Sequence, residues 1–171
     1  IVRLVGSEMC IRDRLWSANA ILDANYHQLV LDTHVDFIKA GAEVIVTTTF
    51  ATRQKRLKEN SLLDKFEYLN QKAGEIAQAA KQNFPNTYIA GGIPPQNLTY
   101  EADDRDEIEI IENFHSQAKT LNPYVDFFYF DVWSSIKEVK CGIDAVKEFK
   151  KPYLVGLHIS CLLYTSDAAD D

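Results

Sequence analysis

The sequence predicts an α/β fold in which helices cover a parallel sheet. Four short runs of β-branched and aromatic residues alternate along the chain with four segments of helical apolar spacing. Such alternation produces parallel strands joined by right-handed crossovers. Two architectures satisfy this order, an open doubly wound sheet and part of a (β/α)8 barrel, and four strands are too few to close the barrel.

The composition excludes several classes of protein. The chain has 171 residues, 46% hydrophobic and 25% charged, which suits one domain with a sizeable core. A net charge of −7 argues against a nucleic-acid partner, and no apolar run reaches the roughly 18 residues of a membrane span. Three cysteines are too few for a disulfide framework. We therefore expect a cytoplasmic protein with neither nucleic acid nor membrane as partner.

The two ends fit poorly with the sequence between them. Residues 1–14 (IVRLVGSEMCIRDR) and 161–171 (CLLYTSDAADD) have no periodicity that continues into their neighbours, and they resemble translated adapter sequence. We interpret both as non-native-looking tails and exclude them from fold reasoning. The domain is then expected over residues 15–160.

The first half predicts helix, strand and helix. A helix is expected over residues 25–40, with Gly41 as its stop, followed by a buried strand over 43–49 (EVIVTTT). Ser61 and Asp64 form a weak capping-box variant that opens a long helix. The apolar stripe of that helix comprises Leu62, Phe66, Leu69, Ala73, Ile76, Ala77, Ala80 and Phe84.

The middle of the chain predicts a second strand and a third helix. The strand covers residues 88–93 (YIAGGI) and is stopped by Pro94 and Pro95. Asp103 or Asp104 can cap the helix that follows. Its expected stripe comprises Ile108, Ile111, Phe114, Ala118 and Leu121.

The last third predicts strand, helix and strand. A strand over residues 125–132 (VDFFYFDV) precedes a helix that Ser135 and Glu138 open with a capping box and that continues through Phe149. Its expected stripe comprises Ile136, Val139, Ile143 and Val146, and leaves Cys141 outside. A strand over residues 153–159 (YLVGLHI) ends the series.

Candidate ligand-binding residues stand where the predicted strands end, because both architectures bind ligands at the C-terminal ends of strands. Asp131 ends an apolar strand, so its carboxylate either receives a cation or caps the next helix. The threonines at 47–49 either contribute to a ligand-binding site or are present only because threonine favours β-strands. Gly91 and Gly92 allow either a close backbone approach or a kink. No Gly-rich phosphate loop follows any strand, which weakens the nucleotide-binding version of the open sheet.

Three segments in this order resemble the homocysteine S-methyltransferase family, which includes betaine–homocysteine methyltransferases and the homocysteine domain of methionine synthase. They are LWSANAILDANYHQLVLDTHVDFIKAGAEVIVTTTFATRQKRL, YIAGGIPP and VDFFYFDVWSSIKEV. The resemblance spans about residues 15–160. It implies a partial TIM barrel, roughly strands 2–5 of the complete fold.

The resemblance also implies a function and a site. The parent enzyme would transfer a methyl group to homocysteine sulfur to give methionine, with S-methylmethionine, betaine or a folate as donor. Thr49 matches a threonine near homocysteine, and Asp131 matches the glutamate that receives its amino group, shorter here by about 1.5 Å. Gly91 and Gly92 would lie beneath the substrate. Pro94 replaces a glycine that is common in relatives.

The family's chemistry further implies zinc, held by three cysteine thiolates and completed by the homocysteine thiol. Those cysteines lie on later strands, and Cys10, Cys141 and Cys161 match none of their positions. We therefore expect zinc in the complete protein, no catalytic or metal-ligating residue in this chain, and an inactive fragment that can form oligomers. A non-catalytic α/β binding module and a TIM-barrel lyase or isomerase are the alternatives.

Overall fold

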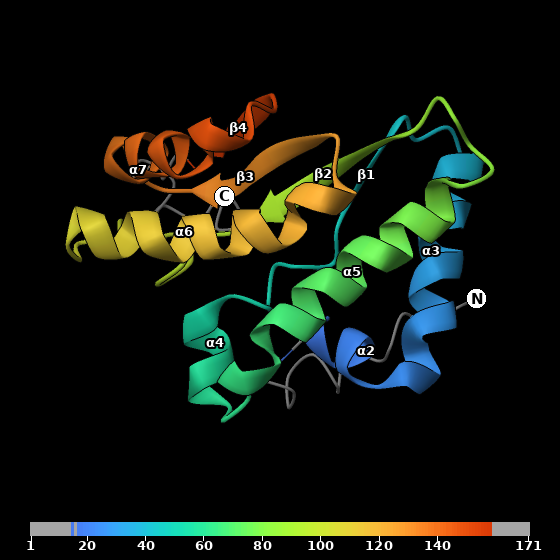
Figure 1. Ribbon diagram of the computed structural model, residues 1–171, viewed down its shortest axis with the longest axis horizontal. Coiled ribbons are helices and arrows are strands. Elements are labelled where there is room, and N and C mark those ends of the chain that lie inside the picture. Colours follow the sequence, from blue (N-terminus) through green and yellow to red (C-terminus); the bar gives the residue numbers. More distant parts are fainter. Residues whose placement is uncertain (1–14, 16, 159–171) are drawn as a thin grey trace, which may run out of the picture.

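The computed structural model describes residue 15 and residues 17–158 (Figure 1). The tails expected at 1–14 and 161–171 lie outside these described residues. The sheet contains β1 (Val44–Val46), β2 (Tyr88–Ile93), β3 (Phe127–Trp133) and β4 (Tyr153–Leu157). All three neighbouring pairs are parallel and the order is β1-β2-β3-β4, which confirms the predicted alternation and strand order.

The helices alternate with these strands. They are α2 (Ala18–Leu22), α3 (His27–Lys39), α4 (Gln54–Glu59), α5 (Phe66–Lys81), α6 (Glu107–Leu121) and α7 (Ile136–Val146). Short 3₁₀ turns lie at Ala24–Tyr26, Leu63–Lys65, Asn122–Tyr124 and Lys147–Phe149. No helix in the described part of the chain is long and apolar enough to cross a membrane.

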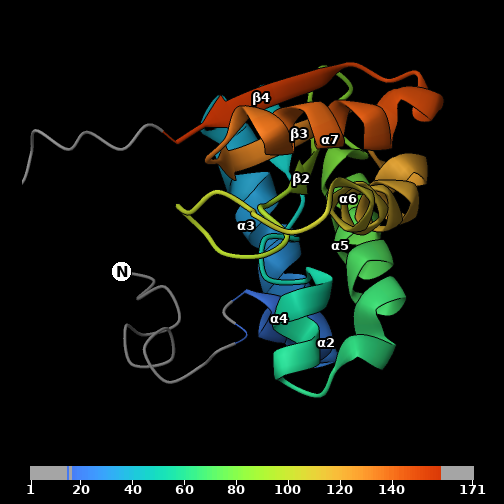
Figure 2. The same cartoon turned by 90° about the vertical axis from the view of Figure 1, so that its left-hand side faces the viewer.

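One face of the sheet carries the main core. Side chains from α3, α5, α6 and α7 pack there against buried strand residues such as Ile45, Ile89 and Phe128. A second cluster, which includes Ile21, Leu57 and Leu69, joins α2, α4 and α5. Figure 2 shows α5, α6 and α7 together on one side of the strands. This is the arrangement of an arc of barrel, in which helices lie outside the strands.

The opposite face of the sheet is open. Val44 of β1, Tyr88 of β2 and Leu154 of β4 are 43%, 57% and 57% exposed. The prediction of a fully buried first strand is therefore wrong: β1 has three residues, and only Ile45 among them is buried. We call this open side the inner face, because it corresponds to the interior of a barrel.

We expect the isolated chain to self-associate. Its inner face exposes apolar side chains, and β1 and β4 are edges of the sheet in the described part of the chain. Light scattering behind a sizing column should show oligomers or aggregates whose mass grows with concentration. A monodisperse monomer with a cooperative melt would contradict this expectation.

The helix ends correct several sequence expectations. Gly41 does stop α3: it has φ +106°, and the N–H groups of Gly41 and Ala42 bond to the carbonyls of Ile38 and Phe37. Ser61 does not cap a helix; it has φ +57°, and α5 begins only at Phe66. The short helix α4 was not predicted, because a single buried residue gives six residues no periodic stripe.

The caps and faces of the later helices differ in detail. Asp106, rather than Asp103 or Asp104, caps α6, with its carboxylate accepting from the Ile108 N–H at 2.9 Å. Ile108 itself is exposed and Ile110 is buried in its place.

For the final helix, α7, the predicted N-cap is correct and the predicted buried face is wrong. Ser135 caps α7 as predicted, since its Oγ accepts from the Glu138 N–H at 3.2 Å. The predicted stripe is wrong at two positions, because Ile136 is exposed and Cys141 is buried in the core.

Candidate functional site

Hydroxyl groups fasten the C-terminal ends of β1 and β2 to each other. The Thr49 hydroxyl donates to the Gly92 carbonyl at 2.6 Å, and the Thr47 hydroxyl accepts from the Gly92 N–H at 3.0 Å. The two hydroxyls lie 2.9 Å apart. The regular strand β1 ends at Val46. Beyond it, these side-chain hydrogen bonds to Gly92 take the place of the backbone hydrogen bonds that would join two longer strands.

Thr49 is fully buried, and its backbone carbonyl accepts hydrogen bonds from two other buried side chains. Its carbonyl accepts from the Thr52 hydroxyl at 3.0 Å and from the Gln117 amide at 3.1 Å. Asn70 completes this buried polar group through Thr52 and Gln117. The Thr49 hydroxyl is thus already hydrogen-bonded to protein groups.

The two glycines of β2 face opposite sides of the sheet. A Cβ on Gly92 would meet Val46 at 3.0 Å and the Thr49 hydroxyl at 3.3 Å, on the inner face. A Cβ on Gly91 would meet Val125 and Phe128, both part of the core. Gly92 is therefore small because Val46 and Thr49 pack against it on the inner face, and Gly91 is small because core side chains pack against it on the other face.

Asp131 lies at the C-terminal end of β3, on the inner face. It alternates with the fully buried Phe128 and Phe130, which point into the core, and is itself only partly buried. Burial raises the pKa of the Asp131 carboxyl, and a hydrogen bond from Tyr129 opposes this shift. The role of helix cap, the other reading of Asp131, belongs to Ser135.

The backbone beside Asp131 is strained. Val132 has φ +60°, a conformation that is unfavourable for a β-branched residue. From Phe130 to Trp133, β3 advances three residues while β4 advances two, so the strand contains a bulge. The bulge returns Trp133 to the core and leaves Asp131 facing the other side. Strained positions of this kind cluster at functional sites.

Two further residues of this region were not identified from the sequence. Tyr129 lies beside Asp131 on the same face, and its ring approaches Gly156 of β4. The two-residue spacing from Asp131 was the signal that could have found it. Arg53 follows β1 and is buried, and no sequence pattern distinguishes it from the neighbouring exposed cations.

The described residues do not fit a thiolate-held zinc ion. Within them no three His, Cys, Asp or Glu side chains lie together as metal ligands. Cys141 is buried among core side chains, and burial raises the pKa of its thiol, which disfavours the thiolate form. We assign no step of any reaction to zinc in this part of the chain.

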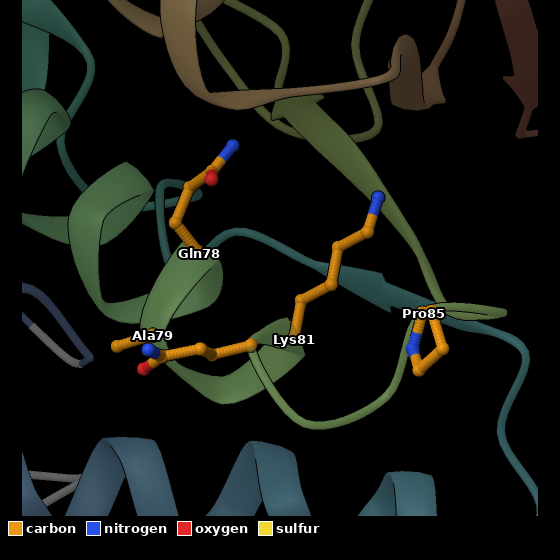
Figure 3. A pocket seen from close by; sticks show the side chains of 5 residues that line it. Gln78, Ala79, Lys81 and Pro85 are labelled. Carbon is orange, nitrogen blue, oxygen red and sulfur yellow. The ribbon is translucent and has the colours of Figure 1, made fainter.

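A hollow of about 480 Å³ lies away from these residues (Figure 3). It is lined by Gln78, Ala79, Lys81, Gln82 and Pro85, at the end of α5 before β2 begins. This is the N-terminal end of the strands, opposite the end that binds ligands in βα folds. Lys81 is occupied by an ion pair with Asp126 at 2.8 Å, so the hollow offers no free charge for chemistry.

Sequentially ordered parallel strands with helices packed on one face define an arc of a (β/α) barrel. The chain belongs to the homocysteine S-methyltransferase family, whose sequence model matches residues 5–168. That match extends into both segments expected to be tails.

Curated relatives and a solved structure agree with this assignment. The S-methylmethionine–homocysteine S-methyltransferase BHMT2 of Rattus norvegicus is 27% identical over 150 residues, which are 87% of this chain and 39% of that protein. Betaine–homocysteine S-methyltransferase 1 of the same species is 27% identical over 145 residues, covering 80% and 34%. The apo homocysteine methyltransferase MmuM of Escherichia coli superimposes with TM-score 0.56 at 15% identity, covering 80% of this chain and 50% of that one. The chain thus spans between about a third and two fifths of the length of these curated relatives.

Proposed function

We propose that this chain forms the homocysteine-binding part of an enzyme that transfers a methyl group to homocysteine sulfur, giving methionine. The observation that carries the proposal is the placement of Asp131. A partly buried carboxylate lies at the ligand-binding end of a barrel arc and is not used as a helix cap. Family membership supplies the chemical class of the substrate.

In this proposal the substrate ammonium group lies against Asp131, and the rest of the amino acid extends over β2. The substrate would meet bare backbone at Gly92, where a Cβ would lie too close to Val46 and Thr49 to be accommodated. Thr49 is separated from Asp131 by one strand, so their backbones are roughly 10 Å apart at the usual strand spacing. Gly91, which faces the core, is no longer part of the proposed site.

The methyl donor and the cofactor belong to the complete protein. Relatives named for S-methylmethionine and for betaine match this chain about equally well, so neither donor is favoured. Zinc, if the complete enzyme uses it, must find its ligands outside the described residues. We propose that this chain alone is inactive. We also propose a cytoplasmic location, which the free thiol of Cys141 supports.

The test is methyl transfer by a complete reading frame that contains this chain. We expect methionine to form from homocysteine with S-methylmethionine or betaine, and the isolated 171-residue chain to form none. Mass spectrometry with an isotopically labelled donor methyl group measures both. A complete protein that binds homocysteine without transferring methyl would support the binding-module alternative, and one that instead cleaves or isomerises a substrate would support the lyase alternative.

A further inference from the structure

The loop between β2 and α6, residues 94–106, is fastened to the segment that follows β1. The Arg53 guanidinium donates from Nη1 to the Pro95 carbonyl at 2.6 Å and contacts the Thr99 hydroxyl at 3.3 Å. Lys55 donates to the Asn97 side chain. We call residues 94–106 the β2–α6 loop. On this side the loop is held by Arg53, which precedes α4, and by Lys55 of α4.

The same loop is also fastened to α7 and to the end of β4. The Lys137 ammonium group of α7 donates to the Arg105 carbonyl at 2.5 Å. The ring of Tyr100 meets that of His158 edge-on, with centroids 4.7 Å apart. In Figure 2 the loop, in yellow-green, projects on the side where β4 ends. It therefore lies at the ligand-binding end of the sheet.

The burial of Arg53 costs folding free energy. It is only 4% exposed, and it forms no ion pair with a carboxylate among the described residues. Its Nε has no hydrogen-bond partner, although its guanidinium lies 5.7 Å from the ring of Phe50. Burial, assisted by Arg56 and opposed by Glu59, lowers the pKa of Arg53 to about 10.

A buried charge without an acidic partner costs stability, and an apolar side chain of similar volume avoids that cost. The fold alone therefore gives no reason for arginine at this position. The reason lies in the groups that the guanidinium contacts. Its Nη1 donates to the Pro95 carbonyl and its Nη2 donates to the Thr99 hydroxyl, so one side chain binds the backbone and a side chain of the same loop. An apolar side chain, or one with a single donor atom, cannot make both contacts.

We propose that Arg53 is a positioning residue for the substrate site, fixing the β2–α6 loop across the C-terminal ends of the strands and holding Tyr100 against His158. The loop is then a fixed wall of the site, formed before substrate arrives, and Arg53 acts through it without touching substrate. The functional meaning rests on the proposed function, whereas the fixing of the loop does not.

The test compares Arg53→Met with Lys58→Met in the complete protein that contains this chain. Lys58 lies on α4 and is exposed, so its replacement removes one positive charge without removing a contact to the loop. We expect amide exchange of residues 96–104 to accelerate by about tenfold in Arg53→Met, the size for losing a hydrogen bond to a charged group. The melting temperature should not fall, and Lys58→Met should leave the loop unchanged. Arg53→Lys should restore part of the protection.

A second measurement follows the far end of the loop. Tyr100 shifts the ring-proton resonances of His158 by its ring current, and Tyr100→Leu gives the reference value without it. In Arg53→Met the His158 resonances should move toward that reference. Loop exchange that stays slow in Arg53→Met, or that accelerates equally throughout β1–β4 with a lower melting temperature, would overturn the proposal. Because no homocysteine is used, either result is independent of the substrate assignment.

Discussion

Trp133→Ala is expected to lower the free energy of unfolding by about 3–5 kcal/mol, a large share of the stability of a domain. The Trp133 side chain is fully buried. It stacks with Phe114 and Phe130, each at a centroid distance of 4.2 Å, and its indole N–H donates to the Ile93 carbonyl at 2.9 Å. The substitution removes contacts among β2, β3 and α6 together and leaves a cavity where they meet.

Urea unfolding followed by circular dichroism measures this loss. Trp133→Phe is the matched control: it keeps an aromatic ring in the stack but removes the hydrogen bond to the Ile93 carbonyl. It should therefore cost less than Trp133→Ala. A cost below about 1 kcal/mol for Trp133→Ala, by the same scale of core truncations, would mean that Trp133 does not hold these elements together.

Regular elements were predictable where local pattern alone decides them. The stripe of α5 was read correctly for Phe66, Leu69 and Ala73, because it repeats along a 16-residue helix. The bounds of β2 were also correct, since Pro94 ends an apolar run. In both cases the deciding residues are neighbours in sequence.

The predicted buried face of α7 is wrong because Trp133, which lies outside the helix, determines which side of α7 packs into the core. A Cβ on Gly142 would lie 2.0 Å from the Trp133 ring, so this glycine and its neighbour Cys141 form the buried side. Trp133 reaches that position only because the bulge at Val132 turns the strand. No helical periodicity within α7 contains this information.

The candidate site shows the same division. Asp131 was a candidate from the sequence because a carboxylate that ends an apolar strand is unusual in any context. The partner of the Thr49 hydroxyl is a carbonyl 43 residues away, and the burial of Arg53 depends on a loop 42 residues away. These contacts follow from tertiary structure, so the sequence predicted neither the partner of the Thr49 hydroxyl nor the burial of Arg53.

Asp131→Asn in the complete protein is expected to weaken homocysteine binding by about 1.5–3 kcal/mol, the range for a hydrogen bond to a charged group. This corresponds to roughly a 10- to 150-fold higher Kd. Asparagine keeps the shape of the side chain and removes the charge that the substrate ammonium would meet. Isothermal titration with homocysteine measures the change. Asp144→Asn, the same substitution at an exposed position of α7, is the control and should leave the Kd unchanged.

The pH dependence separates a substrate role from a structural one. Burial raises the pKa of Asp131, and an ammonium group binds the ionised form, so affinity should fall as the pH drops through that raised pKa. The amide introduced by Asp131→Asn has no proton to gain, hence this variant should lose that part of the pH dependence while its melting temperature stays close to that of the parent. If the substitution lowers the melting temperature and leaves the Kd and its pH profile intact, Asp131 supports the end of β3 and does not bind substrate.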